Sequence, residues 1–293
     1  MVRKVRIGLL DIILLILLAA GVGYLAYVVE ARLEYTWRWE AIPKYLVRYD
    51  QEQGRWVANF LLEGLFTTIR ISILATIMGS VLGLLMGLAR TSRSGFLRLI
   101  GTGYVEFVRN LPPLVLVFIF YFFFSDYIAQ VLGVEQLVRN APEWLQSVMR
   151  VVLAEPSRFT AFLSAAITIA LYEGAFITEI VRAGIQSVEH GQWEAAHALG
   201  LSRWQRLRHV ILPQAFTRIV PPLAGQFIST IKDSSIVSVI SVSELTFQGM
   251  ELMAATYLTF EIWITVALLY FSMTFTLSML ARRLETRLAR KLG

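Results

Sequence analysis

The sequence predicts an all-α integral membrane protein with six transmembrane helices. Of its 293 residues, 56% are hydrophobic and only 16% are charged, which is too apolar for an ordinary soluble domain of this length. Long runs of Leu, Ile, Val and Phe recur along the chain, and short clusters of Lys and Arg stand at their ends. This placement of the net charge of +6 is typical of membrane orientation and argues against a nucleic-acid-binding surface.

Six apolar runs are long enough to cross a bilayer, which takes about 20 residues as a helix. We expect spans at residues 7–29, 57–89, 104–124, 159–185, 215–240 and 260–281. The second run is long, so its first residues are expected along the interface before the chain turns inward. The first run also permits interpretation as a cleaved signal peptide, but its uninterrupted apolar stretch favours a retained helix.

Basic residues in the connections predict the orientation, because cytoplasmic loops retain Lys and Arg during insertion. They concentrate at the amino end, in the second and fourth connections, and in the carboxy-terminal tail. We therefore predict that both termini are cytoplasmic. From the spans and this orientation we expect residues 1–56 to form an N-terminal transmembrane helix with an external connection, and residues 57–293 to form the main membrane core. The external connection at 125–158 is expected to contain a surface helix at 141–153.

The fourth connection is polar and rich in alanine, and it predicts two helices joined by a tight turn. The first helix covers 192–199, and Gly200 is placed to end it in a left-handed conformation. Ser202 is placed to cap a second helix over 203–211, which is expected to end before Pro213. We expect Ala195, Ala196 and Ala198 to allow close approach of a partner, with Trp193 and Leu199 inserting into its groove.

Composition alone leaves a second interpretation of this segment open. Its arginines also suit an amphipathic helix held on anionic lipid, and these are Arg203, Arg206 and Arg208.

The spacing of Glu194-Ala195-Ala196, Gly200 and Val210-x-Leu212-Pro213 resembles the EAA motif of binding-protein-dependent ABC importer permeases. The resemblance implies a five-helix type I importer core after the N-terminal helix, with a cytoplasmic coupling helix within 186–214, between the fourth and fifth spans. It also implies that this segment couples to the ATPase subunits through Glu194, Ala195, Ala196, Gly200, Leu201, Leu212 and Pro213.

Further motifs are similar to the polar amino acid subfamily of these permeases. They are Gly64-Leu65-x-Thr67-Thr68, Tyr104-Val105-Glu106-x-x-Arg109, Glu179-x-x-Arg182-x-Gly184 and Lys232-Asp233-Ser234-Ser235. The resemblance implies a bacterial inner membrane location, a polar amino acid substrate such as glutamate, glutamine, aspartate or a basic one, a second permease chain, identical or related, and an external binding protein. The chain departs from the family in its long third connection and in Pro112-Pro113.

Nucleotide and metal chemistry are not expected in this chain. No segment matches G-x-x-x-x-G-K-[ST], so ATP and Mg²⁺ are expected on a separate ATPase subunit and the chain is expected to be a transport subunit, not an enzyme. The sequence has no cysteine, and no metal site is predicted. His190, His197 and His209 are expected to be solvated or packed.

Charged residues inside predicted spans usually mark a pathway or a partner, because burying them in lipid is costly. The candidates for a substrate pathway are Arg70, Glu173, Lys232 and Asp233. Structural pairing is the alternative for each, and Glu63 and Arg70 share a helix face that allows it. Glu179 and Arg182 are expected to brace the gate or the coupling segment, as a local pair at three-residue spacing.

Small residues recur along the second span and predict tight helix packing; they are Ser72, Thr76, Gly79, Ser80, Gly83 and Gly87. Two rival functions remain open at this point. One is a secondary transporter driven by an ion gradient through Glu173 and Asp233, although paired broken helices in corresponding halves are not seen. The other is a membrane scaffold that only docks a cytoplasmic partner.

Overall fold

The computed structural model describes residues 8–32, 35–52, 54–131 and 133–292. Contacts divide the chain after Ala41 into two units, each described here by itself. The first contains the apolar helix α1 (Leu9–Arg32) and the 3-10 turn η1 (Trp39–Ala41). The second begins at Ile42, so the segment 42–56, which the sequence assigns to the first region, is grouped with the main bundle.

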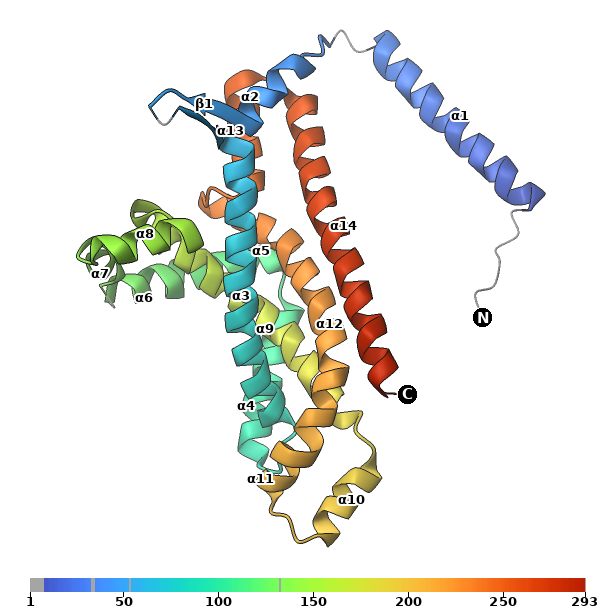
Figure 1. Ribbon diagram of the computed structural model, residues 1–293, viewed down its shortest axis with the longest axis vertical. Coiled ribbons are helices and arrows are strands. Elements are labelled where there is room, and N and C mark those ends of the chain that lie inside the picture. The colour runs from blue at the N-terminus through green and yellow to red at the C-terminus, as the bar shows by residue number, and fades with distance from the viewer. Residues whose placement is uncertain (1–7, 33–34, 53, 132, 293) are drawn as a thin grey trace. The chain divides into compact units, whose positions relative to one another are not determined.

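The second unit opens with a short helix and a hairpin. Helix α2 (Ile42–Leu46) leads into strands β1 (Val47–Asp50) and β2 (Arg55–Ala58), which pair antiparallel with Val47 opposite Ala58. Three long helices follow in the bundle: α3 (Phe60–Arg90), α9 (Phe159–Gln186) and α14 (Thr259–Leu292). Figure 1 shows the hairpin at one end of α3 and the helices α10 (His190–Ala198) and α11 (Arg203–Arg206) at the opposite end of the bundle.

Helices α3 and α9 pack along their lengths and form the centre of the bundle. The predicted small residues make this approach possible. A Cβ atom at Gly83 would lie 2.6 Å from Ile177 Cγ2, and one at Gly87 would lie 2.6 Å from Val181 Cγ1. The two backbones therefore approach more closely than any larger side chain at these positions would allow, as the series predicts. The adjoining core includes Ile71, Phe162 and Ile169.

The predicted third span is not one straight helix. Helix α4 (Gly95–Asn110) and helix α5 (Pro113–Ile119) meet at 115°. Leu111 ends α4 with φ −101° and ψ 145°, the extended conformation that a following proline imposes. Pro113 then occupies the first turn of α5, where its missing N–H costs nothing. The prediction of a single helix over 104–124 is wrong because the proline pair bends the chain.

Shorter elements complete this side of the chain. A π-helical segment η2 (Phe120–Ser125) follows α5, and then come α6 (Asp126–Val131), α7 (Val134–Arg139), α8 (Glu143–Val152) and η3 (Pro156–Arg158). Helix α8 confirms the helix predicted at 141–153.

The fifth predicted span, 215–240, lies within α12 (Leu212–Asp233) and the 3-10 segment η5 (Ser234–Ile240). A further helix, α13 (Leu245–Thr256), follows it. The whole stretch from Arg203 to Ile240 meets α13 at 48°. In the described residues, three helices are long and apolar enough to cross a membrane, and up to five spans result if each bent pair counts as one. Residues Leu9–Gly21 of α1 form a shorter apolar helix, so the count of six stays a prediction.

Candidate functional site

The segment between α9 and α12 forms a helical hairpin, here called the coupling hairpin and comprising residues 190–211. Helix α10 ends at Ala198, and Gly200 follows with φ +72°, in the left-handed region that glycine enters without strain. The Leu201 N–H donates to the Ala196 carbonyl at 3.3 Å and closes the turn. Ser202 then caps α11 in a reciprocal capping box with Gln205. The predicted helix, left-handed turn and capped second helix are confirmed as local structure.

The hairpin buries one face of α10 against its own chain. Ala196 is only 2% exposed, and Trp193 packs onto the core formed by Val181, Ile185 and Ile211. Residues 193 and 196 lie three apart on one helix face, which explains why they turn inward together. The expectation that Trp193 and Ala196 face a partner is therefore wrong. Other positions point outward, and these are Glu194, Ala195, Ala198 and Leu199, the last 79% exposed.

The second half of the hairpin does not end before Pro213, contrary to the prediction. Helix α11 passes into a π-helical segment η4 (Leu207–Ile211) and continues directly into α12. A proline disrupts a helix by removing an N–H and crowding a preceding carbonyl. Here it falls in the first turn of α12, just after the wider π-helical turns. Leu201 and Leu212 are half-buried beside this connection, while Pro213 is exposed.

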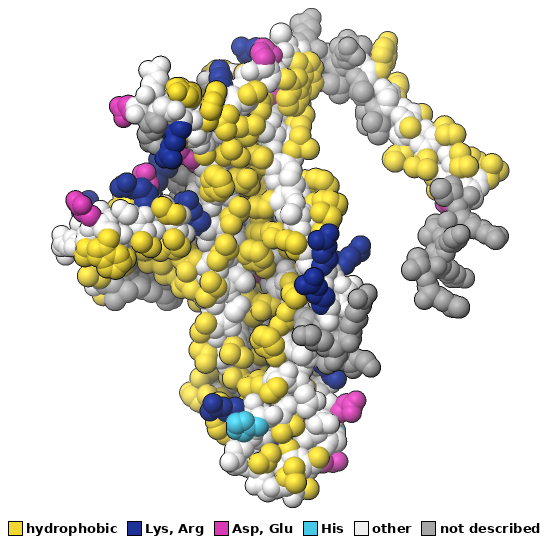
Figure 2. Space-filling model, viewed as in Figure 1, with side chains coloured by type: hydrophobic (Ala, Val, Ile, Leu, Met, Phe, Trp, Pro, Cys, Tyr) yellow, Lys and Arg dark blue, Asp and Glu magenta, His cyan; other side chains and the backbone are white. Residues whose placement is uncertain are grey.

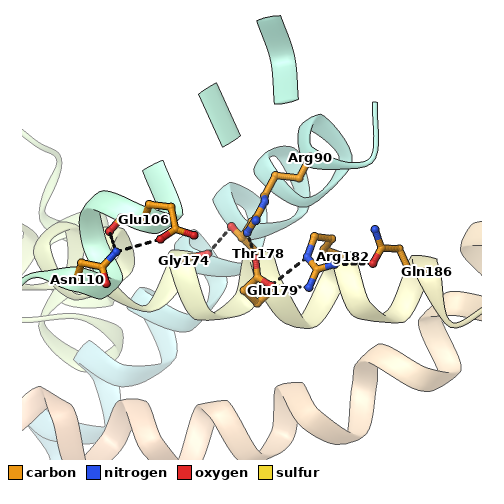
Figure 3. A network of polar contacts seen from close by, with 8 residues as sticks. All are labelled: Arg90, Glu106, Asn110, Gly174, Thr178, Glu179, Arg182 and Gln186. Atoms are coloured by element: carbon orange, nitrogen blue, oxygen red, sulfur yellow. Dashed lines mark hydrogen bonds and ion pairs between the residues drawn. The ribbon is translucent and has the colours of Figure 1, made fainter. Parts of the chain in front are cut away.

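A polar network fixes the end of α9 next to the coupling hairpin (Figure 3). Glu179 of α9 forms ion pairs with Arg90 at the end of α3 and with Arg182, at 2.8 Å, on α9 itself. Arg182 also donates to the Gln186 side chain. The predicted local pair of Glu179 and Arg182 is confirmed. Arg90 is the partner that the sequence analysis missed, because a basic residue at the end of a span was attributed to orientation alone.

Three hydrogen bonds continue from this network into the hairpin and α12. Arg203 of α11 donates to the Thr91 carbonyl at 3.3 Å, just beyond α3. Arg218 of α12 donates to the Ser187 carbonyl, just beyond α9. Gln214 of α12 lies 3.2 Å from Gln192 of α10 through their side-chain amides. The coupling hairpin is thus tied to the end of α3 and to α12, and α12 is tied to the end of α9.

A second polar cluster lies between α9 and α12. Glu173 is fully buried, and it accepts a hydrogen bond from the Gln226 side chain. Asp233, at the end of α12, lies within hydrogen-bonding reach of Glu173. The structure records no ion pair for Glu173 among the residues it describes, and its Oε1 atom is buried without a hydrogen-bond partner. Two of the four pathway candidates, Glu173 and Asp233, are therefore brought together.

The other two candidates lie elsewhere. Arg70 lines a cavity of about 650 Å³ together with Arg48, Arg150 and Arg158. This cavity lies near the hairpin of β1 and β2, at the opposite end of the bundle from the coupling hairpin. Lys232 is exposed, although its neighbour Asp233 is half-buried. No ion pair joins Glu63 and Arg70 within the described part of the chain, so the pairing offered for them is not formed.

Glu244 is a buried carboxylate that the sequence pattern did not single out. It is fully buried and caps α13 by accepting from the backbone N–H groups of Thr246 and Phe247, at 2.9 and 2.7 Å. The Tyr270 hydroxyl of α14 donates to it at 2.9 Å. Glutamate is not among the preferred residues at this cap position, so no sequence signal indicated it. Glu244 joins α13 to α14 at the break in the fifth span.

Metal-binding clusters of three or more His, Cys, Asp or Glu side chains are not found in the described ranges. His190 pairs with Glu194 at 3.0 Å on the exposed face of α10.

The structure thus defines a helical protein with apolar helices long enough to cross a membrane and a braced helical hairpin between α9 and α12. Its residues 79–290 match the family described as "Binding-protein-dependent transport system inner membrane component". The chain belongs to this family, because the match covers well over half of its length. It is therefore the membrane permease component of such a system and not the ATP-hydrolysing subunit, as the sequence predicted.

Relatives agree with this assignment. The chain is 36% identical over 228 residues to the glutamine transport system permease protein GlnP of Escherichia coli K12, covering 78% of this chain and 92% of the relative. It is 36% identical over 251 residues to the L-cystine transport system permease protein TcyB of Bacillus subtilis, covering 85% and 93%. These similarities favour an ABC permease over a transporter driven by an ion gradient.

Solved structures support the fold. The crystal structure of an amino acid ABC transporter with histidines matches with a TM-score of 0.65 and 32% identity, over 86% of this chain and all of the matched chain. An inward-facing structure of the MetNI methionine ABC transporter matches with a TM-score of 0.54 at 18% identity, over 77% and 96% of the two chains. The second likeness concerns the fold alone.

Proposed function

We propose that this chain is one of two permease subunits in an ATP-driven importer of polar amino acids. An external binding protein delivers the amino acid, and two ATPase subunits, which carry ATP and Mg²⁺, bind at the coupling hairpins. The second permease is an identical or a related chain, because one permease offers one hairpin and a symmetric pair of ATPases needs two. The names of the relatives, which include glutamine and cystine permeases, support this substrate class.

The observation that carries the proposal is the exposed face of the coupling hairpin. Leu199 and the Gly200 turn stand exposed at the tip, and α10 offers the small side chain of Ala195 next to Glu194. A short helix with small outward side chains and one large apolar residue suits insertion into a partner's groove. The basic residues near this end favour a cytoplasmic placement, with both termini on the same side of a bacterial inner membrane.

In this proposal, ATP binding to the ATPase subunits shifts the permease pair between an outward-open and an inward-open state. Closure of the ATPase dimer would draw the two hairpins together, and the hydrogen bonds to Thr91 and Ser187 would carry this motion to α3 and α9. The candidate pathway residues are Glu173 with Asp233, in the cluster between α9 and α12, and Arg70 in the cavity at the other end. Lys232 contributes from an exposed position beside Asp233.

The test is the substitution Gly200→Asp in the full complex, with uptake and ATPase co-purification as readouts. The left-handed conformation disfavours a side chain, and a carboxylate at the tip of the hairpin opposes docking. We expect ATP-driven uptake and retention of the ATPase to be lost together.

Gly54→Asp is the matched control. Gly54 has φ +61°, is exposed, and lies in the β1–β2 hairpin at the opposite end of the bundle. It therefore introduces the same side chain under the same backbone constraint. If Gly200→Asp retains both readouts, or if Gly54→Asp abolishes ATPase retention equally, the hairpin is not the docking element.

A further inference from the structure

Three cavities adjoin one another where the turn after α3 meets the coupling hairpin. Their volumes are about 410, 340 and 430 Å³, and Thr91 and Trp193 line all three. Shared walls make them parts of one hollow between the 91–94 turn and the helices α10 and α11. The residues lining this hollow do not include Leu199 or Gly200 at the tip of the hairpin, although Glu194 of α10 borders both surfaces.

One part of the hollow is apolar. Its lining includes Leu88 at the end of α3, Leu97 at the start of α4, and Trp204 and Leu207 of the second hairpin helix. Large apolar side chains of this region are left uncovered by the protein. Trp204, which lines the cavity, is 60% exposed, and Phe96, next to Leu97 in the sequence, is 70% exposed. Uncovered aromatic side chains beside basic ones are typical of the membrane interface.

The neighbouring part of the hollow is cationic. Arg93, Arg203 and Arg206 line it, and Arg98 lines the third cavity. The one carboxylate among the lining residues is Glu194, which is engaged with His190. No ion pair is recorded for these four arginines in the described ranges of the chain, and the Nε atom of Arg206 is buried without a hydrogen-bond partner. Figure 2 shows basic and histidine side chains gathered beside apolar ones at this end of the bundle.

The two parts together match an amphiphile with an anionic head. We propose that this hollow binds one anionic phospholipid molecule, whose phosphate contacts Arg93, Arg203 and Arg206 and whose acyl chain lies along Leu97, Trp204 and Leu207. Arginine guanidinium groups are well suited to phosphate oxygens. Free phosphate would leave the apolar part unfilled, so the adjoining apolar cavity favours a lipid.

The position of the hollow gives the lipid a structural role. Arg203 already reaches from the hairpin to the Thr91 carbonyl, and Arg93 stands two residues further along the same turn. A phosphate between Arg93 and Arg206 would add a second link between the turn and the hairpin. The bound lipid would thus hold the coupling hairpin against α3, in addition to the ion pairs that brace α9.

The experiment measures lipid bound to the full complex, purified with its ATPase, after exchange into bilayer discs of phosphatidylcholine containing a small fraction of phosphatidylglycerol. The test variant carries Arg93→Gln and Arg206→Gln together. Native mass spectrometry counts the phosphatidylglycerol molecules that remain on the protein. We expect the double variant to bind phosphatidylglycerol at least about tenfold more weakly, which corresponds to about 1.4 kcal/mol.

Two controls fix the interpretation. Arg287→Gln removes an exposed arginine from the far end of α14 and is expected to leave the bound lipid unchanged. Arg93→Lys with Arg206→Lys keeps the charge and is expected to recover most of the binding, which separates loss of the site from loss of the fold.

Three outcomes would overturn the proposal. The first is equal phosphatidylglycerol on the double Gln variant and the unchanged protein. The second is displacement of the lipid by inorganic phosphate at low excess, which would make the hollow a free-phosphate site. The third is loss of the ATPase with no loss of lipid, which would assign the arginines to acidic side chains of that subunit.

Discussion

Two glutamates on helix α9, six residues apart, have opposite surroundings. Glu179 sits between two arginines, Arg90 and Arg182, and keeps some exposure to solvent. Glu173 is fully buried, has an amide and another carboxyl group as partners, and makes no ion pair in the described part of the chain. A buried carboxyl group without a counter-charge is costly, so natural proteins keep one where it has a use. We therefore expect Glu179 to hold the bundle together and Glu173 to serve transport.

The largest effect on stability is expected from Glu179→Ala. This change leaves two partly buried guanidinium groups without their carboxylate, and breaking such a pair costs about 3 kcal/mol, the lower end of the range for buried pairs. Thermal unfolding of the purified protein in detergent measures it. The control is Glu135→Ala, which removes an exposed pair with Arg139 and is expected to change the free energy of unfolding by less than about 0.5 kcal/mol. Equal effects of the two changes would remove Glu179 from its structural role.

A double-mutant cycle sharpens this assignment. The changes Arg90→Gln and Glu179→Gln, made separately and together, are expected to give a coupling energy of about 1–2 kcal/mol, because the two side chains are in direct contact across α3 and α9. Additive effects would show that Arg90 and Glu179 act independently.

Arg182→Lys is expected to have a smaller effect, about 1 kcal/mol or less. Lysine keeps the charge but loses the planar group with which Arg182 contacts Glu179 and Gln186 at the same time. Chemical denaturation of the purified protein, followed by tryptophan fluorescence, measures this loss of stability. A loss as large as that of Glu179→Ala would mean that geometry, and not charge, dominates the network.

The smallest effect on stability is expected from Glu173→Gln, and the same change is expected to reduce uptake strongly. The amide keeps the size of the side chain and removes the ionisable group, so the free energy of unfolding stays within about 1 kcal/mol of the original or rises. Uptake by the reconstituted complex is expected to fall at least about tenfold.

The combined outcome tests the contrast. If Glu173→Gln destabilises the protein as Glu179→Ala does and leaves uptake unchanged, the two glutamates have the same role and the distinction fails.

Much of the fold follows from local sequence. The lengths of the apolar runs predict where the spans lie. Small residues at four-residue spacing predict the close packing of α3 against α9, and glycine at position 200 predicts the left-handed turn. Features that depend on distant partners were not predictable. The inward rotation of Trp193 and Ala196 depends on the core beneath α10, and the pairing of Arg90 with Glu179 joins residues on different helices.

The other wrong predictions concern prolines, because proline bends the chain at one position and is accommodated within a helix at another. The pair Pro112-Pro113 bends the third span, whereas Pro213 is absorbed within a continuous helix. The difference lies in the preceding backbone, which is extended at Leu111 and π-helical at Leu207–Ile211. Pro112 accounts for the extended state at Leu111, whereas the π-helical state before Pro213 is not fixed by the local residue pattern.

The unbroken path from α11 through η4 into α12 has a mechanical meaning. A flexible joint at Pro213 would let the hairpin rotate while the membrane helix stayed still. A continuous helix instead transmits displacement along its axis, and the 22 residues of α12, which include Pro221 and Pro222, extend over about 33 Å at 1.5 Å per residue. The far end of that helix is Asp233, beside the buried Glu173. Under the proposed function, a push on the hairpin would be delivered as displacement at the acidic cluster, deep within the bundle.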